Sequence, residues 1–358
     1  MSFRASVHRA RKRTARLLTF VATVGLAACG TPGDGGEERS GRPAVRDTAV
    51  LADGGRRLHV KIMGAGRDTV VVPLAYWNQA GFGTIAGGRT FIFYDPRGRR
   101  ESDPVAEPSE YGLERDLADL EAVRVGLGLG RFALIGTSYY GALAARYAML
   151  HPERVSRLVL VGALYPRRDP HIRYEPPADP GRVDSGAVAR LERMREEGRD
   201  TLDPVAFCRA YWAVEGPSTV GDPASAARRT YPCELPNEWP TNTSAWGAGV
   251  FRSLGDWDWR EAARRLEVPA LVIHGEMDRM VPLASSAEWA ELLPGGWLLV
   301  LPGAGHVPWW EHEETVFPRV DEFLDGQVPA AASNPTASRR PALRGEAASG
   351  GGRRRLDS

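Results

Sequence analysis

The residues of this chain that could do chemistry together are a serine, an aspartate and a histidine: Ser138, Asp278 and His306. A serine hydroxyl is a weak nucleophile until a histidine removes its proton, and an acid must orient the histidine and stabilise the imidazolium. The three residues are far apart in the sequence, so they could act as a unit only if the fold brings them together. The elements around each residue therefore decide whether the chain is an enzyme.

The segment around Ser138 has the pattern of a strand, a sharp turn and a helix. An apolar run, 132–135, stops at Gly136, and a pattern of small residues continues from Gly141. Such a nucleophile elbow holds the serine at a strained backbone angle with its hydroxyl above the sheet edge. Tyr140 stands where a second glycine is usual. Either Gly141 supplies the close packing by itself, or the turn is more open and Tyr140 shapes the pocket.

Asp278 and His306 each follow a predicted late strand. Asp278 comes after the apolar run 270–274, and His306 comes after 297–301. Ligand-binding groups of doubly wound sheets lie on loops after the carboxyl ends of strands, so both residues are expected near Ser138. Of the seven histidines, only His306 occupies a loop after a late strand. Glu276 is the nearest rival for the acid.

Alternation of apolar runs and helical patterns predicts an α/β protein, a mostly parallel, doubly wound sheet covered on both faces. The core is expected at 47–164 and 258–326, and the segment 165–257, rich in tryptophan and charged helical patterns, is predicted to be an inserted helical cap. The strands preceding the elbow are expected at 49–52, 58–63, 69–72 and 90–94, and a further strand at 155–161. Helices are expected at 79–86, 114–129, 139–150, 284–293 and 316–324.

The ends of the chain differ from its middle. Residues 1–28 hold six basic and no acidic side chains and end in an apolar run that is too short to span a membrane, the pattern of a secretory signal. Small residues followed by Cys29 resemble a bacterial lipobox, so we expect an exported, membrane-anchored lipoprotein acylated at Cys29. The segment 29–46 is expected to be a flexible tether, and 327–358 a disordered tail.

The charge balance bears on nucleic-acid binding, and the cysteine content bears on disulfide formation. Beyond residue 28 the chain carries 40 basic and 45 acidic residues, so no basic face for nucleic acid is implied. If Cys29 is lipidated, Cys208 and Cys233 remain as a pair in an oxidising compartment, and we expect a disulfide between them.

Two backbone N–H groups are expected to bind the developing oxyanion. One belongs to Tyr139, the residue after the nucleophile. The other is assigned to Tyr76, in the loop after the strand 69–72. Trp77 of the same loop and Tyr140 of the elbow are expected to contact substrate.

The chain resembles the α/β-hydrolase superfamily and, within it, the proline iminopeptidase branch of serine aminopeptidases. The likeness rests on the segment 93–103, which is similar to the branch's Asp-x-Arg-Gly-x-Gly-x-Ser motif, and on the elbow and the Asp278 and His306 segments. In that branch, cap glutamates bind the free amino group of the substrate. The segment 212–216 is similar to one such motif, so the resemblance implies Glu215 as an amine anchor. The branch's His-Gly-Gly-Pro-Gly loop is missing.

These features predict an exported serine hydrolase that works through an acyl-enzyme and needs no metal or cofactor. An aminopeptidase acting on small peptides is favoured. A carboxylesterase or amide hydrolase for small apolar esters, with the tryptophan-rich cap as a lid, is the alternative. A non-catalytic surface binding protein on the same scaffold is the alternative of another class. The expected partners are a small-molecule or peptide substrate and, through the lipid, a membrane, while the sequence does not predict the oligomeric state.

Overall fold

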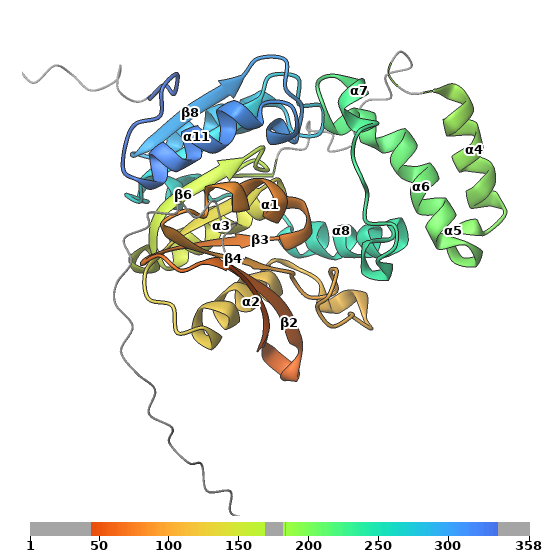
Figure 1. Ribbon diagram of the computed structural model, residues 1–358, viewed down its shortest axis with the longest axis horizontal. Helices are drawn as coiled ribbons and strands as arrows, with labels where there is room; N and C mark the ends of the chain where they lie inside the picture. The colour runs from red at the N-terminus through yellow and green to blue at the C-terminus, as the bar shows by residue number, and fades with distance from the viewer. Residues whose placement is uncertain (1–43, 169–181, 183, 336–358) are drawn as a thin grey trace, which may run out of the picture. The chain divides into compact units, whose positions relative to one another are not determined.

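The computed structural model describes residues 44–168, 182 and 184–335 (Figure 1). Within this part of the chain, eight strands form one sheet in the order β1-β2-β4-β3-β5-β6-β7-β8. The strands are β1 (Val45–Leu51), β2 (Arg57–Gly64), β3 (Asp68–Pro73), β4 (Arg89–Tyr94), β5 (Phe132–Thr137), β6 (Val155–Val161), β7 (Ala270–Gly275) and β8 (Gly296–Leu301). The α/β prediction is therefore confirmed.

The direction of the strands places several loops at one edge of the sheet. β2 is antiparallel to β1 and β4. The six strands β4, β3, β5, β6, β7 and β8 are parallel to one another. The loops after the parallel strands consequently leave from the same edge, where α/β proteins bind their ligands.

Helices cover both faces of this sheet. They are α1 (Ala75–Phe82), α2 (Leu113–Gly126), α3 (Tyr139–Leu150), α9 (Arg260–Arg264), α10 (Leu283–Leu292) and α11 (Glu313–Leu324). Apolar residues of α2, α3 and α10 pack with one face of the strands, and those of α1 and α11 pack with the other. Since β5 is buried on both sides, its run from Phe132 to Thr137 has no polar alternation.

The described part of the segment between β6 and β7 consists of helices joined by loops. Its helices are α4 (Ser185–Glu196), α5 (Arg199–Leu202), α6 (Pro204–Glu215), α7 (Pro223–Ala226) and α8 (Pro240–Leu254). The chain leaves and re-enters the core at one place, because Arg167 pairs with Asp258 in an antiparallel bridge. A disulfide joins Cys208 of α6 to Cys233, and α4 lies beside α6 (Figure 1).

Two predicted boundaries were wrong. The tether was expected to extend to residue 46, but β1 begins at Val45, because Val45 and Arg46 pair with Met63 and Ile62 of β2. The tail was expected to be disordered from residue 327. Instead, the backbone N–H and C=O of Ser333 exchange hydrogen bonds of 2.8 Å with those of Leu298. β8 is an edge strand, and its unpaired backbone groups offer partners that the composition of the tail does not reveal.

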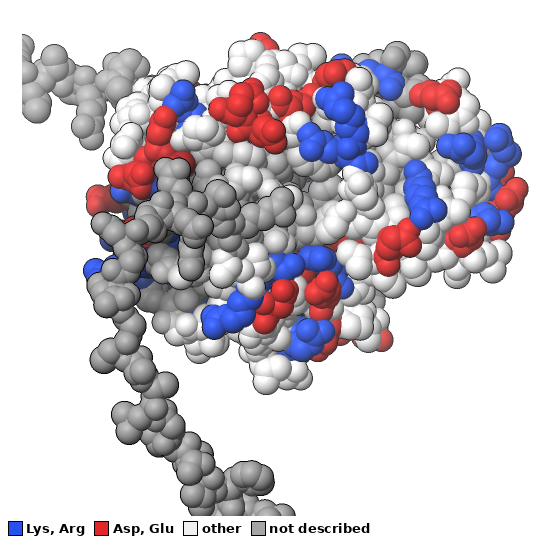
Figure 2. Space-filling model, in the orientation of Figure 1, with Lys and Arg blue, Asp and Glu red and all other residues white. Residues whose placement is uncertain are grey.

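The signal segment and Cys29 lie outside the described residues. In the part that is described, no helix has the length and apolar character needed to cross a membrane. On the face shown in Figure 2, basic and acidic side chains lie in small mixed groups.

Candidate active site

Ser138 stands between β5 and α3 in a strained backbone conformation, with φ 53° and ψ −126°. A positive φ is rare for a residue with a side chain, so the surrounding structure must hold it there. The Ser138 N–H donates to the carbonyl oxygen of Val161 at 2.8 Å, which fixes the turn against β6. Its hydroxyl makes no hydrogen bond to the helix that it caps. The hydroxyl is thus left for other chemistry.

Two glycines allow the close packing of the elbow. A Cβ on Gly136 would lie 2.1 Å from the carbonyl oxygen of Tyr140, and one on Gly141 would lie 2.7 Å from the Cβ of Ala163. Tyr140 itself needs no such closeness, because its ring is buried and stacks on Trp246 of α8 at 5.9 Å. Gly141 with Gly136 therefore supplies the packing that the usual second glycine gives, and Tyr140 packs between core and cap.

The structure brings Asp278 and His306 together. Asp278 Oδ2 lies 2.7 Å from His306 Nδ1. Asp278 Oδ1 accepts the backbone N–H groups of Met280 and Val281 at 2.8 and 2.9 Å, so the carboxylate is held from both sides. Burial opposes the charge of Asp278, but His306 outweighs it and lowers the pKa of this carboxyl. Glu276, the rival acid, accepts a hydrogen bond from the N–H of Gly303.

Gly162 connects this pair with the elbow. It follows β6 directly after Val161, the residue that binds the Ser138 N–H, and a Cβ at Gly162 would lie 3.2 Å from His306 Nδ1. The imidazole therefore lies over the end of the strand next to the nucleophile. Because Nδ1 faces Asp278, Nε2 is the nitrogen that can accept a proton from Ser138.

The two predicted oxyanion donors both lie in the first turns of helices. Tyr76 is the second residue of α1 and Tyr139 is the first residue of α3. N–H groups in a first turn have no intrahelical partner and suit a developing anion. Leu74, which caps α1, has φ 63° although it is not a glycine, a second strained position that the sequence does not reveal.

Trp77 joins the core to the cap. Its ring lies 5.4 Å from that of Trp212 on α6, 6.3 Å from that of Tyr231 and 5.7 Å from that of Trp310. The hydroxyl of Tyr76 donates to the carbonyl oxygen of Thr230. A cavity of about 590 Å³ opens within the cap next to these rings. Its lining residues include Trp212, Pro217, Ala226, Thr230 and Tyr231.

The cap tryptophans do not form one lid. Trp212 packs with Trp77 and Tyr231, Trp246 packs with Tyr139 and Tyr140, and Trp257 packs with Trp259. Only the first group borders the cavity.

Glu215 ends α6, three residues after Trp212. Burial raises the pKa of this carboxyl, and Arg195 opposes the rise. The short helix Gly216–Thr219 follows, and the carbonyl oxygen of Thr219 accepts the N–H of Val307 at 3.1 Å. The end of α6 is thereby tied to the loop of His306.

Two pairs of charged or polar residues near the elbow were not predicted. The hydroxyl of Tyr139 donates to Asp116 at 2.7 Å, and burial raises the pKa of Asp116 to about 7. Arg99 forms two hydrogen bonds, of 2.8 and 2.6 Å, with Glu238 of the cap, and both side chains are buried. In the sequence Asp116, Arg99 and Glu238 look like ordinary surface charges, so only the fold reveals their burial.

The chain belongs to the α/β-hydrolase fold family, whose model matches residues 75–313. It is accordingly a serine hydrolase. A proline iminopeptidase of Xylella fastidiosa is 27% identical over 242 residues, which cover 60% of this chain and 74% of the relative.

Esterases are also similar to this chain. A pimeloyl-[acyl-carrier protein] methyl ester esterase of Aromatoleum aromaticum is 32% identical over 201 residues, 53% of this chain and 73% of the relative. The structure of an esterase from Exiguobacterium antarcticum superposes with a TM-score of 0.57 over 78% of this chain and 100% of the esterase, at 19% identity. This last likeness concerns the fold.

Proposed function

We propose that this chain is an aminopeptidase that removes amino-terminal residues from small peptides. Ser138 attacks the carbonyl carbon while His306 takes its proton, and Asp278 holds the imidazole and stabilises its charge. The N–H groups of Tyr76 and Tyr139 bind the oxyanion. His306 then gives the proton to the leaving amine. Water, activated by the same histidine, hydrolyses the acyl-enzyme, and the proton returns to the serine oxygen.

The observation that carries the proposal is the 2.7 Å contact between His306 Nδ1 and Asp278 Oδ2 at the end of the strand beside Ser138. It sets the tautomer in which Nε2 is a base. Together with a serine whose φ is 53°, it matches what acyl transfer requires.

The preference for peptides rests on Glu215. Burial raises the pKa of Glu215 more than Arg195 lowers it, so the ammonium group of a peptide would stabilise the charged carboxylate further. Glu215 follows Trp212 by three residues on α6, and Trp212 both lines the cap cavity and packs on Trp77. The iminopeptidase relatives agree with this choice.

A fluorophosphonate probe tests the nucleophile. We expect it to label the wild type and not Ser138→Ala, whose turnover should fall by about a thousandfold or more. Well-folded wild-type protein that takes no label would contradict the enzyme and leave a binding protein on the same scaffold.

Alanine and proline arylamides test the peptidase. Glu215→Gln should raise KM for the amides and leave short-chain aryl esters unchanged. Glu192→Gln is the matched control, because Glu192 is an exposed cap glutamate of α4 that does not line the cavity. Equal amide turnover in both variants would remove the amine anchor.

A second candidate function is a carboxylesterase for small apolar esters. It is favoured by the tryptophan and tyrosine rings that line the cap cavity and by the esterase that is 32% identical. Fast turnover of aryl esters with negligible turnover of any amino-acid arylamide would select this candidate.

We also propose that the enzyme is exported and anchored by a lipid on Cys29, which the residues before it support. Growth in labelled palmitate should label the wild type and not Cys29→Ser. If the wild type takes up no label while it is exported, the signal is a plain one.

A further inference from the structure

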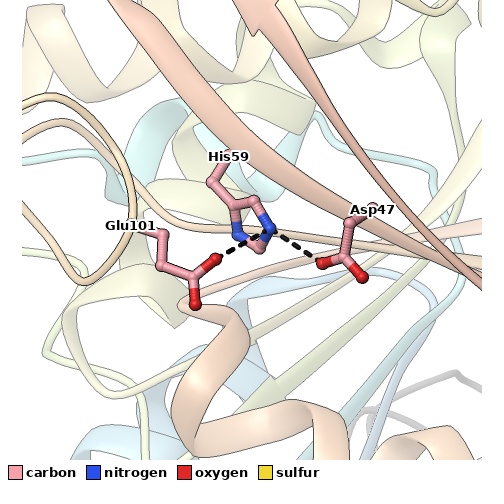
Figure 3. A group of neighbouring side chains, drawn as sticks. All are labelled: Asp47, His59 and Glu101. Atoms are coloured by element: carbon pink, nitrogen blue, oxygen red, sulfur yellow. Dashed lines mark hydrogen bonds and ion pairs between the residues drawn. The ribbon is translucent and has the colours of Figure 1, made fainter.

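Three side chains from distant parts of the sequence meet beside the edge of the sheet: Asp47 of β1, His59 of β2 and Glu101 of the loop after β4 (Figure 3). His59 pairs with Ala49 across the antiparallel ladder, so Asp47 is its diagonal neighbour. His59 Nε2 lies 2.9 Å from Asp47 Oδ1 and 3.1 Å from Glu101 Oε2. One ligand atom from each residue lies within 4.8 Å of the other two.

The other nitrogen of His59 is already occupied. Its Nδ1 lies 3.0 Å from Oδ2 of Asp95, a carboxylate that is 1% exposed and follows β4. The hydroxyl of Ser102 accepts the backbone N–H of His59 at 2.9 Å and fixes the position of the ring. An imidazole whose Nδ1–H is given to a carboxylate presents the lone pair of Nε2, and this arrangement recurs behind histidines that bind metals.

Nε2 consequently points at two carboxylate oxygens. The lone pair of Nε2 and the two carboxylate oxygens repel one another unless a positive charge lies between them. That charge is either a second proton on the ring or a bound cation. The His59 side chain is only 6% exposed, whereas those of Asp47 and Glu101 are 57% and 47% exposed. The open side of the group gives an ion a way in and room for water.

The ligand types favour zinc. One imidazole and two carboxylates suit Zn²⁺, whereas Ca²⁺ and Mg²⁺ prefer oxygen ligands alone. Ligands at about 2.0–2.2 Å from a tetrahedral zinc lie about 3.3–3.6 Å apart. The observed separations from Nε2 are shorter, 2.9 and 3.1 Å, so the two exposed carboxylates would have to move outward by a few tenths of an ångström to admit the ion.

Two cations already lie near the acids. Lys61 Nζ is 3.5 Å from Asp47 Oδ1, and Arg100 Nη2 is 3.3 Å from Glu101 Oε1. Arg100 contacts the oxygen that does not face His59, so its pairing is compatible with a bound ion. Lys61 shares the oxygen that a metal would need and would have to turn away.

We propose that Asp47, His59 and Glu101 bind one divalent zinc-like ion, with water completing its coordination. The ion would tie the edge strand β1 to the loop between β4 and α2. Since none of the ligands belongs to the triad, the site would stabilise the fold and take no part in the hydrolysis.

The test measures zinc on the full chain. Protein stripped with a chelator is equilibrated with Zn²⁺, and bound metal and thermal unfolding are recorded. We expect about one ion per chain at this site and a rise in Tm, since a ligand that binds only the folded state stabilises it. His59→Asn or Glu101→Gln should weaken zinc binding by about 100-fold or more, and Asp95→Asn by about 10- to 100-fold.

His312→Gln is the matched control, because His312 Nδ1 lies 3.8 Å from Glu314 Oε1 and, among the described residues, no third ligand completes a metal-binding group with them. It should bind zinc as the wild type does. The proposal is overturned if the wild type retains no zinc at micromolar metal, which would leave Nε2 protonated. It is equally overturned if zinc binds with the same affinity to Glu101→Gln, whose exposed position should let the variant fold.

Discussion

At the scale of single residues, the two carboxylate oxygens of Asp278 accept hydrogen bonds from different partners. Oδ1 takes two backbone N–H groups and Oδ2 takes His306. Asp278→Asn would keep the shape but place an amide that cannot serve both donors, so the imidazole would adopt the wrong tautomer. We expect kcat for an aryl ester to fall by about 10³- to 10⁴-fold with little change in fold.

Glu276→Gln is the control for this variant, because Glu276 binds only the N–H of Gly303 among the described contacts. It should keep a kcat close to that of the wild type. A loss as large as that of Asp278→Asn would mean that the acid has been assigned to the wrong residue.

The two tyrosines after the nucleophile should respond in opposite ways. The hydroxyl of Tyr140 is buried and has no hydrogen-bond partner, whereas that of Tyr139 donates to Asp116. Tyr140→Phe removes an unsatisfied group and should leave the free energy of unfolding unchanged or raise it by about 1 kcal/mol. Tyr139→Phe should lower it by about 1–3 kcal/mol. Denaturant unfolding of both variants measures the difference, and a larger loss in Tyr140→Phe would contradict it.

At the scale of elements, the ion pair between Arg99 and Glu238 connects the loop after β4 with the cap. The backbone N–H of Arg100 adds a further bond of 3.1 Å to Glu238. Removing one partner leaves a buried charge, so Glu238→Gln should cost about 3 kcal/mol or more of unfolding free energy. Replacing both, with Arg99→Met and Glu238→Leu, should cost clearly less than the single change.

The pair of Arg209 and Glu234 is the control for this prediction. Its side chains are 66% and 72% exposed. Glu234→Gln should change stability by less than about 1 kcal/mol. If Glu238→Gln changed the free energy of unfolding as little as this control, the buried ion pair would not be what stabilises the packing of the cap on the core.

The elements that carry the chemistry could be predicted because their signals are local. The run 132–135, its glycine and the small residues after it indicate a strand and a helix without knowledge of any partner. Arg99 and Glu238 are 139 residues apart, and nothing near either one shows that it is buried. The group of Asp47, His59 and Glu101 depends on strand register in the same way.

The dependence on partners that are distant in the sequence also explains the wrong predictions for the tail and for the tryptophans of the cap. The composition of residues 327–358 predicts disorder from local content alone. Ser333 is ordered because β8 happens to be an edge strand, a property of the whole sheet. The cap tryptophans divide into separate groups for a similar reason, since each packs on a partner that is distant in sequence.

At the scale of the whole molecule, Asp116 should give the stability a distinct dependence on pH. Burial raises the pKa of Asp116 from 3.8 to about 7, and the hydrogen bond from Tyr139 opposes this rise. Between these two values the folded chain holds a proton that the unfolded chain has lost. Stability from this residue is therefore greatest below about pH 4, falls as the pH rises towards 7, and stays low above it.

Asp116→Asn isolates this effect, because it imitates the neutral acid at every pH while the other titrating groups remain. Since one pKa unit is worth about 1.4 kcal/mol, the variant should gain up to about 4 kcal/mol relative to the wild type between about pH 4 and pH 8. Tm measured across this range for both proteins gives the difference. A Tm difference between the two proteins that does not change with pH would contradict this prediction. It would mean that Asp116 is charged in the folded state throughout the range, so that the hydroxyl of Tyr139 donates to a carboxylate.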